Sequence, residues 1–454
     1  MSANELEPVS LVAADLSKGS LALVALGIFV VAYALVIAEE FTHLRKSKPV
    51  VMAAGLLWTL VAIAWEQAGL PGAGDALRRN LLEYGGLLLF LLAAMTFVNT
   101  LEERRVFAAL RGWMVGRRLS LRAIFWLTGA LAFVLSPVLD NLTTALVMGA
   151  IALSLGRGNA GFIVPACVNI VVAANAGGAF SPFGDITTLM VWQQGLLDFF
   201  DFLKLFAPSL VNWLVPAIFM SFAVSGERPS AAVEVISMKP GAWAVIGLFA
   251  ATIATTVLAH QALHLPPFLG MMTGLGALQL YGYVIRRMEL RVYRPPESTP
   301  LGFKPAHRPF DIFISVKRAE WDTLLFFYGV VLCVGALGAF GHLALLAQGS
   351  YAAVGPTWSN ILVGIASALI DNIPIMFAVL SMQPDMSEGQ WLLVTLTAGV
   401  GGSLLSIGSA AGVALMGQAR GVYTFFAHMK WAWAVALGYL ASIGLHFLIN
   451  ADSF

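Results

Sequence analysis

The stretch SPVLDNLTT, residues 136–144, decides the fold of this chain, because it places an Asp-Asn pair inside an apolar segment. A second polar stretch follows, NAGGAFSPFGDITT at 175–188. The same order of features returns later as SALIDNIP at 367–374 and GVGGSLLSIGS at 399–409. Each copy has an Asp-Asn pair, a gap, a Gly-Gly pair and a further Gly seven residues after the first of that pair. Carboxylates and broken helices are costly at membrane depth, so this pattern indicates an ion or substrate site.

The composition around these stretches is that of a helical membrane protein. Of the 454 residues, 59% are hydrophobic and only 11% are charged, and the mean hydropathy is +0.83. A soluble domain carries about 25% charged residues. The net charge of +1 gives no sign of nucleic-acid binding. We therefore predict an all-α polytopic membrane protein.

Apolar runs of roughly 20 residues, the length that spans a bilayer, set the layout. We predict ten crossings, eight of them whole and two interrupted. The whole crossings are expected near 20–38, 50–66, 83–101, 208–225, 241–260, 266–285, 320–340 and 431–449.

The four polar stretches define the remaining elements. The interrupted crossings are expected at 160–196 and 389–418. Re-entrant helical hairpins are expected at 123–156 and 357–383, with the Asp-Asn pairs at their tips. The apolar arms beside the first pair are too short for two full spans, and a proline at each tip suits a helix break.

Lysine and arginine sort to one side of this layout when the N-terminus is placed outside. All but four of the 26 fall in predicted inside segments, and the exceptions are Lys18, Arg78, Arg79 and Lys204. Positive charge favours the cytoplasmic side, so we expect a multi-pass protein of a bacterial-type inner (plasma) membrane. The basic loop at 286–318 is predicted to be a cytoplasmic linker, with anionic-lipid binding as the alternative.

The layout also predicts a domain plan. Residues 1–80 supply an N-terminal segment and scaffold helices, 81–225 the first repeat, 226–319 connecting helices with the basic loop, and 320–454 the second repeat. The first repeat begins outside and the second inside, so the two are inverted. Inverted repeats with broken helices at the midplane are an architecture of secondary transporters.

Side-chain oxygens at the breaks are the candidate ligands. Carbonyl, hydroxyl and carboxylate oxygens suit a hard cation, and no Lys or Arg stands in the four stretches. Buried carboxylates must bind protons or metal, which makes protons and cation competitors. The predicted cation- and proton-binding residues are Asp140, Asn141, Thr144, Asn175, Asp185, Thr187, Thr188, Asp371, Asn372, Ser403, Ser406 and Ser409. Na+ or Li+ is expected at Asp140, Asn141, Asp185, Asp371 and Asn372.

Plainer roles for these acids stay open. Asp185 can serve as the N-cap of its half-helix, although the neutral Ser409 stands at the corresponding place. Glu83, Glu320 and Asp322 lie at crossing starts, either as solvated interfacial carboxylates or as a proton entry pathway.

At the quoted motifs the sequence resembles the NhaD-type sodium/proton antiporters of the ion transporter superfamily. The resemblance rests on residues 136–144, 175–188 and 371–374 and extends over roughly 80–450. It implies a homodimer, a scaffold domain and a transport domain that moves as an elevator, and exchange of sodium or lithium for protons. Dicarboxylate carriers of that superfamily have Ser-Asn-Thr at the hairpin tips, whereas Asp-Asn stands here, which favours a cation as substrate.

We therefore expect a secondary active Na+ (or Li+)/H+ antiporter without a cofactor, and not an enzyme. The first rival is a sodium- or proton-coupled anion or oxyanion carrier of the same fold. An intramembrane enzyme is disfavoured because the sequence shows no His/Glu zinc motif and no Ser–His or Ser–Lys pairing at membrane depth.

Overall fold

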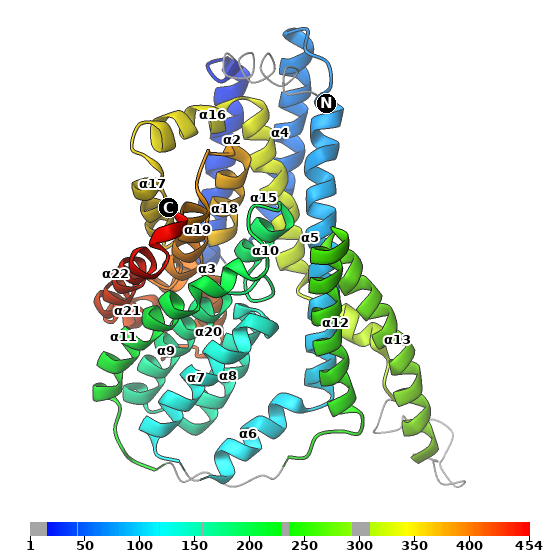
Figure 1. Ribbon diagram of the computed structural model, residues 1–454, viewed down its shortest axis with the longest axis vertical. Helices are drawn as coiled ribbons and strands as arrows, with labels where there is room; N and C mark the ends of the chain where they lie inside the picture. Colours follow the sequence, from blue (N-terminus) through cyan, green and yellow to red (C-terminus); the bar gives the residue numbers. More distant parts are fainter. Residues whose placement is uncertain (1–15, 43, 118, 157, 229–235, 293–308) are drawn as a thin grey trace. The chain divides into compact units, whose positions relative to one another are not determined.

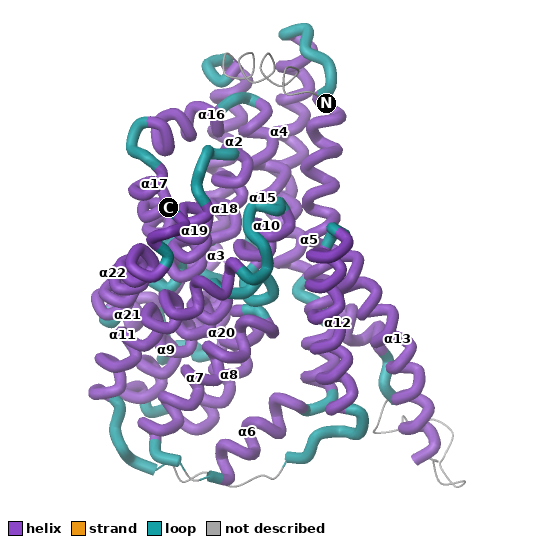
Figure 2. Tube along the Cα trace, in the orientation of Figure 1, coloured by secondary structure: helices purple, strands orange, loops and turns teal. Residues whose placement is uncertain are grey.

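The computed structural model describes residues 16–42, 44–117, 119–156, 158–228, 236–292 and 309–454 (Figure 1). Figure 2 shows helices joined by loops and turns in these ranges, and no strand occurs among them. The first 15 residues and the middle of the predicted basic loop, 293–308, lie outside the described residues. The predicted all-helical fold is confirmed.

The chain divides into two compact units, each described by itself. Unit 1 comprises Met1–Tyr84, Arg118–Ala231 and Asp322–Phe454. Its earlier helices are α2 (Ser20–Ile37), α3 (Glu39–Thr42), α4 (Ser47–Gln67), the start of α5 (Ala73–Glu103), α7 (Leu121–Leu139), α8 (Asn141–Gly156), α9 (Ala160–Gly178), α10 (Ile186–Gln193), η2 (Asp201–Leu205) and α11 (Phe206–Ala223). Its later helices are α15 (Trp321–Ala339), α16 (His342–Ala347), η3 (Gln348–Ala352), α17 (Pro356–Ala366), α18 (Asn372–Met382), α19 (Glu388–Gly401), η4 (Ser406–Gly408), α20 (Ala410–Gln418), α21 (Phe425–Met429), α22 (Ala432–Ile449) and η5 (Ala451–Ser453).

Unit 2 comprises Gly85–Arg117 and Ala232–Trp321. It holds the rest of α5 together with α6 (Val106–Gly116), α12 (Ala242–Leu263), α13 (Pro267–Val292) and α14 (Ile312–Lys317).

Ten helices within the described ranges are long and apolar enough to cross a bilayer. The predicted number is the same, but the two sets differ. The helix α7 has 19 residues and qualifies, although a short hairpin arm was predicted, whereas α19 has only 14. The expectation of two short arms is wrong for α7, because Pro137 lies inside the helix, which continues to Leu139.

The helix breaks fall where the sequence places them. One residue, Asp140, separates α7 from α8, and residues 367–371 separate α17 from α18. The interrupted crossings appear as α9 and α10, parted at 179–185, and as α19 and α20, parted at 402–409. Whether the two helix pairs re-enter the membrane from one side stays a prediction.

The interrupted helices form the centre of unit 1. In α9, 83% of the apolar window is buried, against 22% in α2. Every residue of α19 from Trp391 to Gly401 is buried. The helix α9 is covered by protein because it packs against α7, α8, α11, α19 and α20. The breaks of these helices therefore lie within unit 1.

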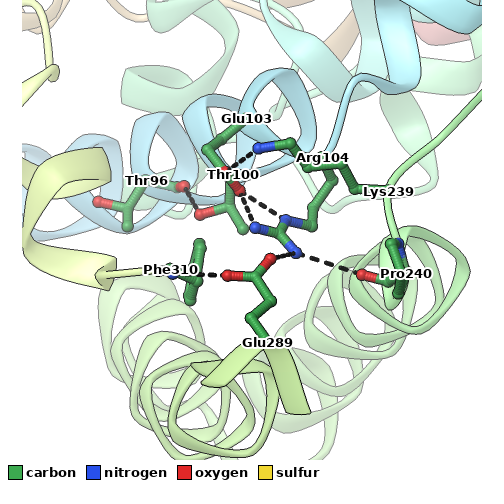
Figure 3. A network of polar contacts seen from close by, with 8 residues as sticks. All are labelled: Thr96, Thr100, Glu103, Arg104, Lys239, Pro240, Glu289 and Phe310. Carbon is green, nitrogen blue, oxygen red and sulfur yellow. Dashed lines mark hydrogen bonds and ion pairs between the residues drawn. The ribbon is translucent and has the colours of Figure 1, made fainter. Parts of the chain in front are cut away.

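An ion-pair network holds unit 2 together around the buried Arg104, which directly follows α5 (Figure 3). Its Nη1 donates to Glu289 Oε1 at 2.8 Å and to Pro240 O at 3.2 Å, and its Nε donates to Glu103 Oε2 at 2.5 Å. Glu289 Oε2 accepts from the amide of Phe310 at 2.7 Å. The network ties the end of α5 to α13 and to the segment before α14.

Replacing Arg104 with Met should destabilise the protein by about 3–5 kcal/mol, because two poorly exposed carboxylates lose their common partner. The matched control is Arg78→Met within α5, where the side chains of Arg78 and Asp75 are 80% and 70% exposed and their pair so contributes little. Thermal unfolding in detergent, followed by tryptophan fluorescence, measures both. Equal melting temperatures for the two variants would contradict the role of the network.

Candidate ion-binding site

The two copies of the broken-helix motif make the same backbone contact. Ser136 Oγ on α7 donates to Ala174 O on α9 at 2.6 Å. Ser367 Oγ, after α17, donates to Ala398 O on α19 at 2.9 Å. In each copy a serine just before the Asp-Asn pair thus hydrogen-bonds to the first half of the interrupted helix, α9 in the first copy and α19 in the second.

The glycine pairs let each break fold tightly against its own helix. A Cβ on Gly178 would lie 2.7 Å from the carbonyl oxygen of Gly184. A Cβ on Gly402 would lie 2.6 Å from the carbonyl oxygen of Gly408. Real Cβ atoms do not approach backbone oxygens so closely, so only glycine fits at these positions. The spacing noted in the sequence is explained by this close approach.

Asp185 is the carboxylate on which both copies converge. It is 4% exposed and precedes α10, whose Thr187 amide donates to Oδ1 at 3.1 Å. Asn141 Nδ2, from the first Asp-Asn pair, donates to Oδ2 at 2.9 Å. Asn372 Nδ2, from the second pair, donates to Oδ2 at 3.0 Å and to Oδ1 at 3.3 Å. Asn141 and Asn372, which lie 44 residues before and 187 residues after Asp185 in the sequence, therefore hold one buried acid.

The amide network continues from this acid into the second broken helix. Asn141 Nδ2 also donates to Asn175 Oδ1 at 3.2 Å. Asn175 Nδ2 donates to Ser403 Oγ at 2.8 Å, next to the Gly-Gly pair of the other copy. All four breaks are thus connected through side chains.

Asp185 acts as an acceptor in all of these contacts. Three groups, the Thr187 amide and the side-chain amides of Asn141 and Asn372, donate N–H bonds to its oxygens. A cation at the same place would need oxygens instead. Asparagine offers both, because turning its amide group exchanges the NH2 for the carbonyl oxygen. The site can therefore hold Asp185 with or without a bound cation.

Asp140 faces the first turn of the helix that follows it. Its Oδ1 accepts from the Thr143 amide at 2.8 Å, and its Oδ2 accepts from Thr143 Oγ1 at 2.9 Å. The φ angle of Asp140 is +64°, in the region that disfavours residues other than glycine. Such strain costs about 1–3 kcal/mol and collects at functional sites.

Asp371 faces a lysine that the sequence did not reveal. Lys46 Nζ, from the segment before α4, lies 3.3 Å from Asp371 Oδ2. No Lys or Arg stands in the four sequence stretches, but the fold brings the basic side chain of Lys46 to one of the breaks. Lys46 is 325 residues away in sequence, and only the packing of α2 and α4 in unit 1 brings it there.

The other predicted ligands take three kinds of position. Thr188 Oγ1 donates to Ser181 O and Asp185 O, both at 2.7 Å, and Ser409 caps α20 by accepting from the Gly412 amide. The buried hydroxyls of Thr144, Thr187 and Ser406 have no hydrogen-bond partner in the part of the chain described.

Asp140, Asp185 and Asp371 each have different contacts in the structure. No group of three His, Cys, Asp or Glu side chains suited to a metal occurs among the described residues. Asp185 lies among amides, Asp140 caps a helix and Asp371 pairs with an ammonium. Side-chain and backbone oxygens would therefore supply most ligands to a cation here.

The predicted proton-pathway acids differ in their surroundings. Glu83 and Glu320 are exposed. Asp322, in the first turn of α15, accepts from Ser47 Oγ at 2.5 Å, beside Lys46. Of the three, Asp322 is the one whose described contacts bring it toward Asp371.

His428 on α21 supports the second break and was missed in the sequence. It is fully buried, and its Nε2 lies 2.9 Å from the carbonyl oxygen of Ser403. Its Nδ1 lies 2.7 Å from Tyr423 Oη. Burial lowers the pKa of His428 to about 4, against a smaller opposing effect of the Ser403 carbonyl. No local sequence signal marks this histidine, because it lies in a short helix between loops.

The depressed pKa of His428 predicts acid sensitivity of the fold. Between pH 6.5 and pH 4 the unfolded chain binds a proton at this residue that the folded protein refuses, so stability falls as the pH falls. The loss amounts to about 3 kcal/mol over that range. His428→Gln should reduce the drop in melting temperature between pH 7.5 and about pH 5. The exposed His264, changed to Asn, is the control, and an unchanged pH dependence in His428→Gln would contradict the assignment.

A multi-pass helical protein whose broken helices enclose a buried, hydrogen-bonded acid has the construction of a membrane transporter. A family model described as citrate transporter matches residues 16–399. The chain is 56% identical to the Na(+)/H(+) antiporter NhaD of Alkalimonas amylolytica, over 97% of this chain and 93% of that protein. It is 54% identical to the NhaD of Halomonas elongata, over 97% and 91%. Sodium/proton antiporter 1 of Arabidopsis thaliana is 31% identical, over 93% and 72%.

The chain therefore belongs to the citrate-transporter family and, within it, to the group of NhaD proteins. The resemblance noted at the sequence motifs is confirmed over nearly the whole chain.

Proposed function

We propose that this protein exchanges Na+ for protons across the membrane, with cation and proton competing for carboxylates at the helix breaks. The observation that carries the proposal is Asp185, a buried acid held by one asparagine from each Asp-Asn pair. The relatives named NhaD, at 52–56% identity, support sodium and protons as the exchanged ions.

Competition follows from the chemistry of Asp185. A cation binds only its ionised form, whereas a proton occupies the oxygen that a cation would use. Asn141 and Asn372 would turn their amide oxygens to the cation, with Asn175, Thr144 and Ser406 as further oxygen ligands. Since both copies contribute to this acid, a change in its charge acts on both helix pairs at once.

We further propose the inverted-repeat and elevator architecture with two re-entrant hairpins and a scaffold domain. The matched serine contacts and the matched glycine approaches in the two copies support the repeat. A homodimer, transport of Li+, an inner-membrane location and an external N-terminus complete the proposal.

A second candidate is a coupled carrier of citrate or another anion. The match to a family described as citrate transporters and the ammonium of Lys46 favour it. Against it, the amide N–H groups at the centre already bond Asp185, and Lys46 already pairs with Asp371.

An assay in inside-out vesicles with a preset pH gradient distinguishes the Na+/H+ antiporter from the anion carrier. Dissipation by NaCl or LiCl and not by choline chloride is expected for the antiporter, and KCl measures selectivity. A lack of response to every cation over a wide pH range, together with uptake of labelled citrate, would overturn the proposal.

A further inference from the structure

The pair formed by Lys46 and Asp371 is more than a surface contact. The side chains are 16% and 13% exposed, so solvent screens them poorly. Lys46 Nζ also lies 4.4 Å from the centre of the Phe326 ring on α15, within the range of a cation–π contact. The ammonium of Lys46 thus contacts two separate elements, α15 and the α17–α18 break.

The positive-inside bias accounts for basic residues between α2 and α4 but does not require a lysine at position 46 itself. Lys46 directly precedes α4, where the positive end of the helix dipole disfavours a cation. Lys46 makes no side-chain cap, and Ser47 turns its hydroxyl to Asp322. What distinguishes Lys46 from the other basic residues of this segment is the set of contacts that its ammonium makes with Asp371 and Phe326.

Asp371 offers one occupied and one open oxygen. Oδ2 pairs with Lys46, whereas the buried Oδ1 has no hydrogen-bond partner within the described ranges. A cation that approached Oδ1 would meet a carboxylate whose charge is already balanced. It could bind well only if the ammonium moved away.

Other titratable groups surround this pair. Asp185 and Tyr33 of α2 lie within electrostatic reach of Asp371. Glu39 and Asp322 lie within electrostatic reach of each other, with Lys46 beside Glu39. His342 of α16 is turned to Ala22 O. Lys46 is thus the one cation whose described contacts reach Asp371.

We propose that Lys46 is the resident counter-cation of Asp371, which the transported cation or a proton must displace. The inference rests on the proposed exchange function and adds a specificity-determining residue to it. Three cations then compete for one carboxylate: the tethered ammonium, Na+ and H+. Displacement also releases the segment between α2 and α4 from the α17–α18 break, so that ion binding changes how these helices are joined.

The proposal predicts how the half-saturating Na+ concentration for exchange changes when Lys46 is replaced. Without the ammonium, Na+ and protons both find Asp371 unopposed. At alkaline pH, where protons are scarce, Lys46→Gln should lower the half-saturating Na+ concentration at least about threefold, the effect of losing a weak ion pair. Toward neutral pH the same variant should lose activity earlier than wild type, because protons also bind more readily. Lys46→Arg keeps the charge and should retain the wild-type half-saturating Na+ concentration and the wild-type pH dependence of activity.

The experiment uses purified full-length protein in proteoliposomes, with exchange measured against Na+ concentration at several pH values. The control is Lys48→Gln, an exposed lysine two positions away. An unchanged or raised half-saturating Na+ concentration in Lys46→Gln at alkaline pH would overturn the counter-cation role. Absence of Na+-dependent exchange in wild type would instead overturn the proposed function.

A melting experiment tests the pair without transport. In choline chloride, the loss of melting temperature in Lys46→Gln and that in Asp371→Asn should not add up in the double variant, since each removes the same pair. In saturating NaCl the non-additivity should shrink, because Na+ has displaced the ammonium. Additive losses in choline, or a coupling that Na+ leaves unchanged, would contradict the proposal. If Lys46→Gln folds poorly, the double variant should recover, because no unpaired carboxylate remains.

Discussion

Sodium-dependent proton exchange is expected to be lost in Asp185→Asn, while the fold is retained. The substitution keeps the shape of the side chain and removes the charge that a cation needs. Loss of a buried charge's partner costs about 3–5 kcal/mol, which corresponds to a fall of more than about a hundredfold in affinity. Asn also keeps an oxygen to accept from the Thr187 amide, so α10 stays capped.

The control for this prediction is Asp75→Asn, which removes an exposed carboxylate from α5. Exchange is measured in proteoliposomes, and folding by the melting temperature in detergent. If Asp185→Asn exchanged Na+ at the wild-type rate, Asp185 would be a helix cap and the centre of the site would lie elsewhere.

The second prediction with a large effect concerns the acids of the two Asp-Asn pairs. Asp140→Asn and Asp371→Asn should both fold and both lose exchange. At position 140 asparagine is as good a cap as aspartate and has the same shape, so the substitution adds no new backbone strain. At position 371 the change leaves the ammonium of Lys46 without a counter-charge.

Asp140→Asn separates a structural from a functional role, because its visible contacts are those of a cap. Retained exchange in this variant would assign Asp140 to capping alone. Retained exchange in Asp371→Asn would remove Asp371 from the ion path. Initial rates at saturating Na+ and alkaline pH give the comparison.

Local sequence predicted the helices because their causes are local. Apolar length sets each span, and the Asp-Asn and Gly-Gly pairs mark the breaks, so α9 with α10 and α19 with α20 begin and end within a few residues of the expected positions. The extent of α7 was missed because a proline in the last turn of a helix need not end it.

Contacts between distant segments could not be predicted in this way. Lys46 contacts Asp371, which lies 325 residues away in the sequence. His428 contacts the carbonyl oxygen of Ser403 from a helix that is too short to show a hydrophobic periodicity. The sequence identified Asp140, Asp185 and Asp371 by type and position. It could not show that each has its own surroundings, because side-chain direction depends on the tertiary packing of the broken helices.

The most direct test of the competition is proton release by the purified protein on binding sodium. Weakly buffered, detergent-solubilised protein is mixed with NaCl or choline chloride, and the change in pH is recorded over a range of starting pH. We predict that NaCl and not choline releases protons, and that Asp185→Asn releases fewer. Sodium binding without proton release at any starting pH, in a protein whose melting temperature rises with Na+, would contradict competition at these carboxylates.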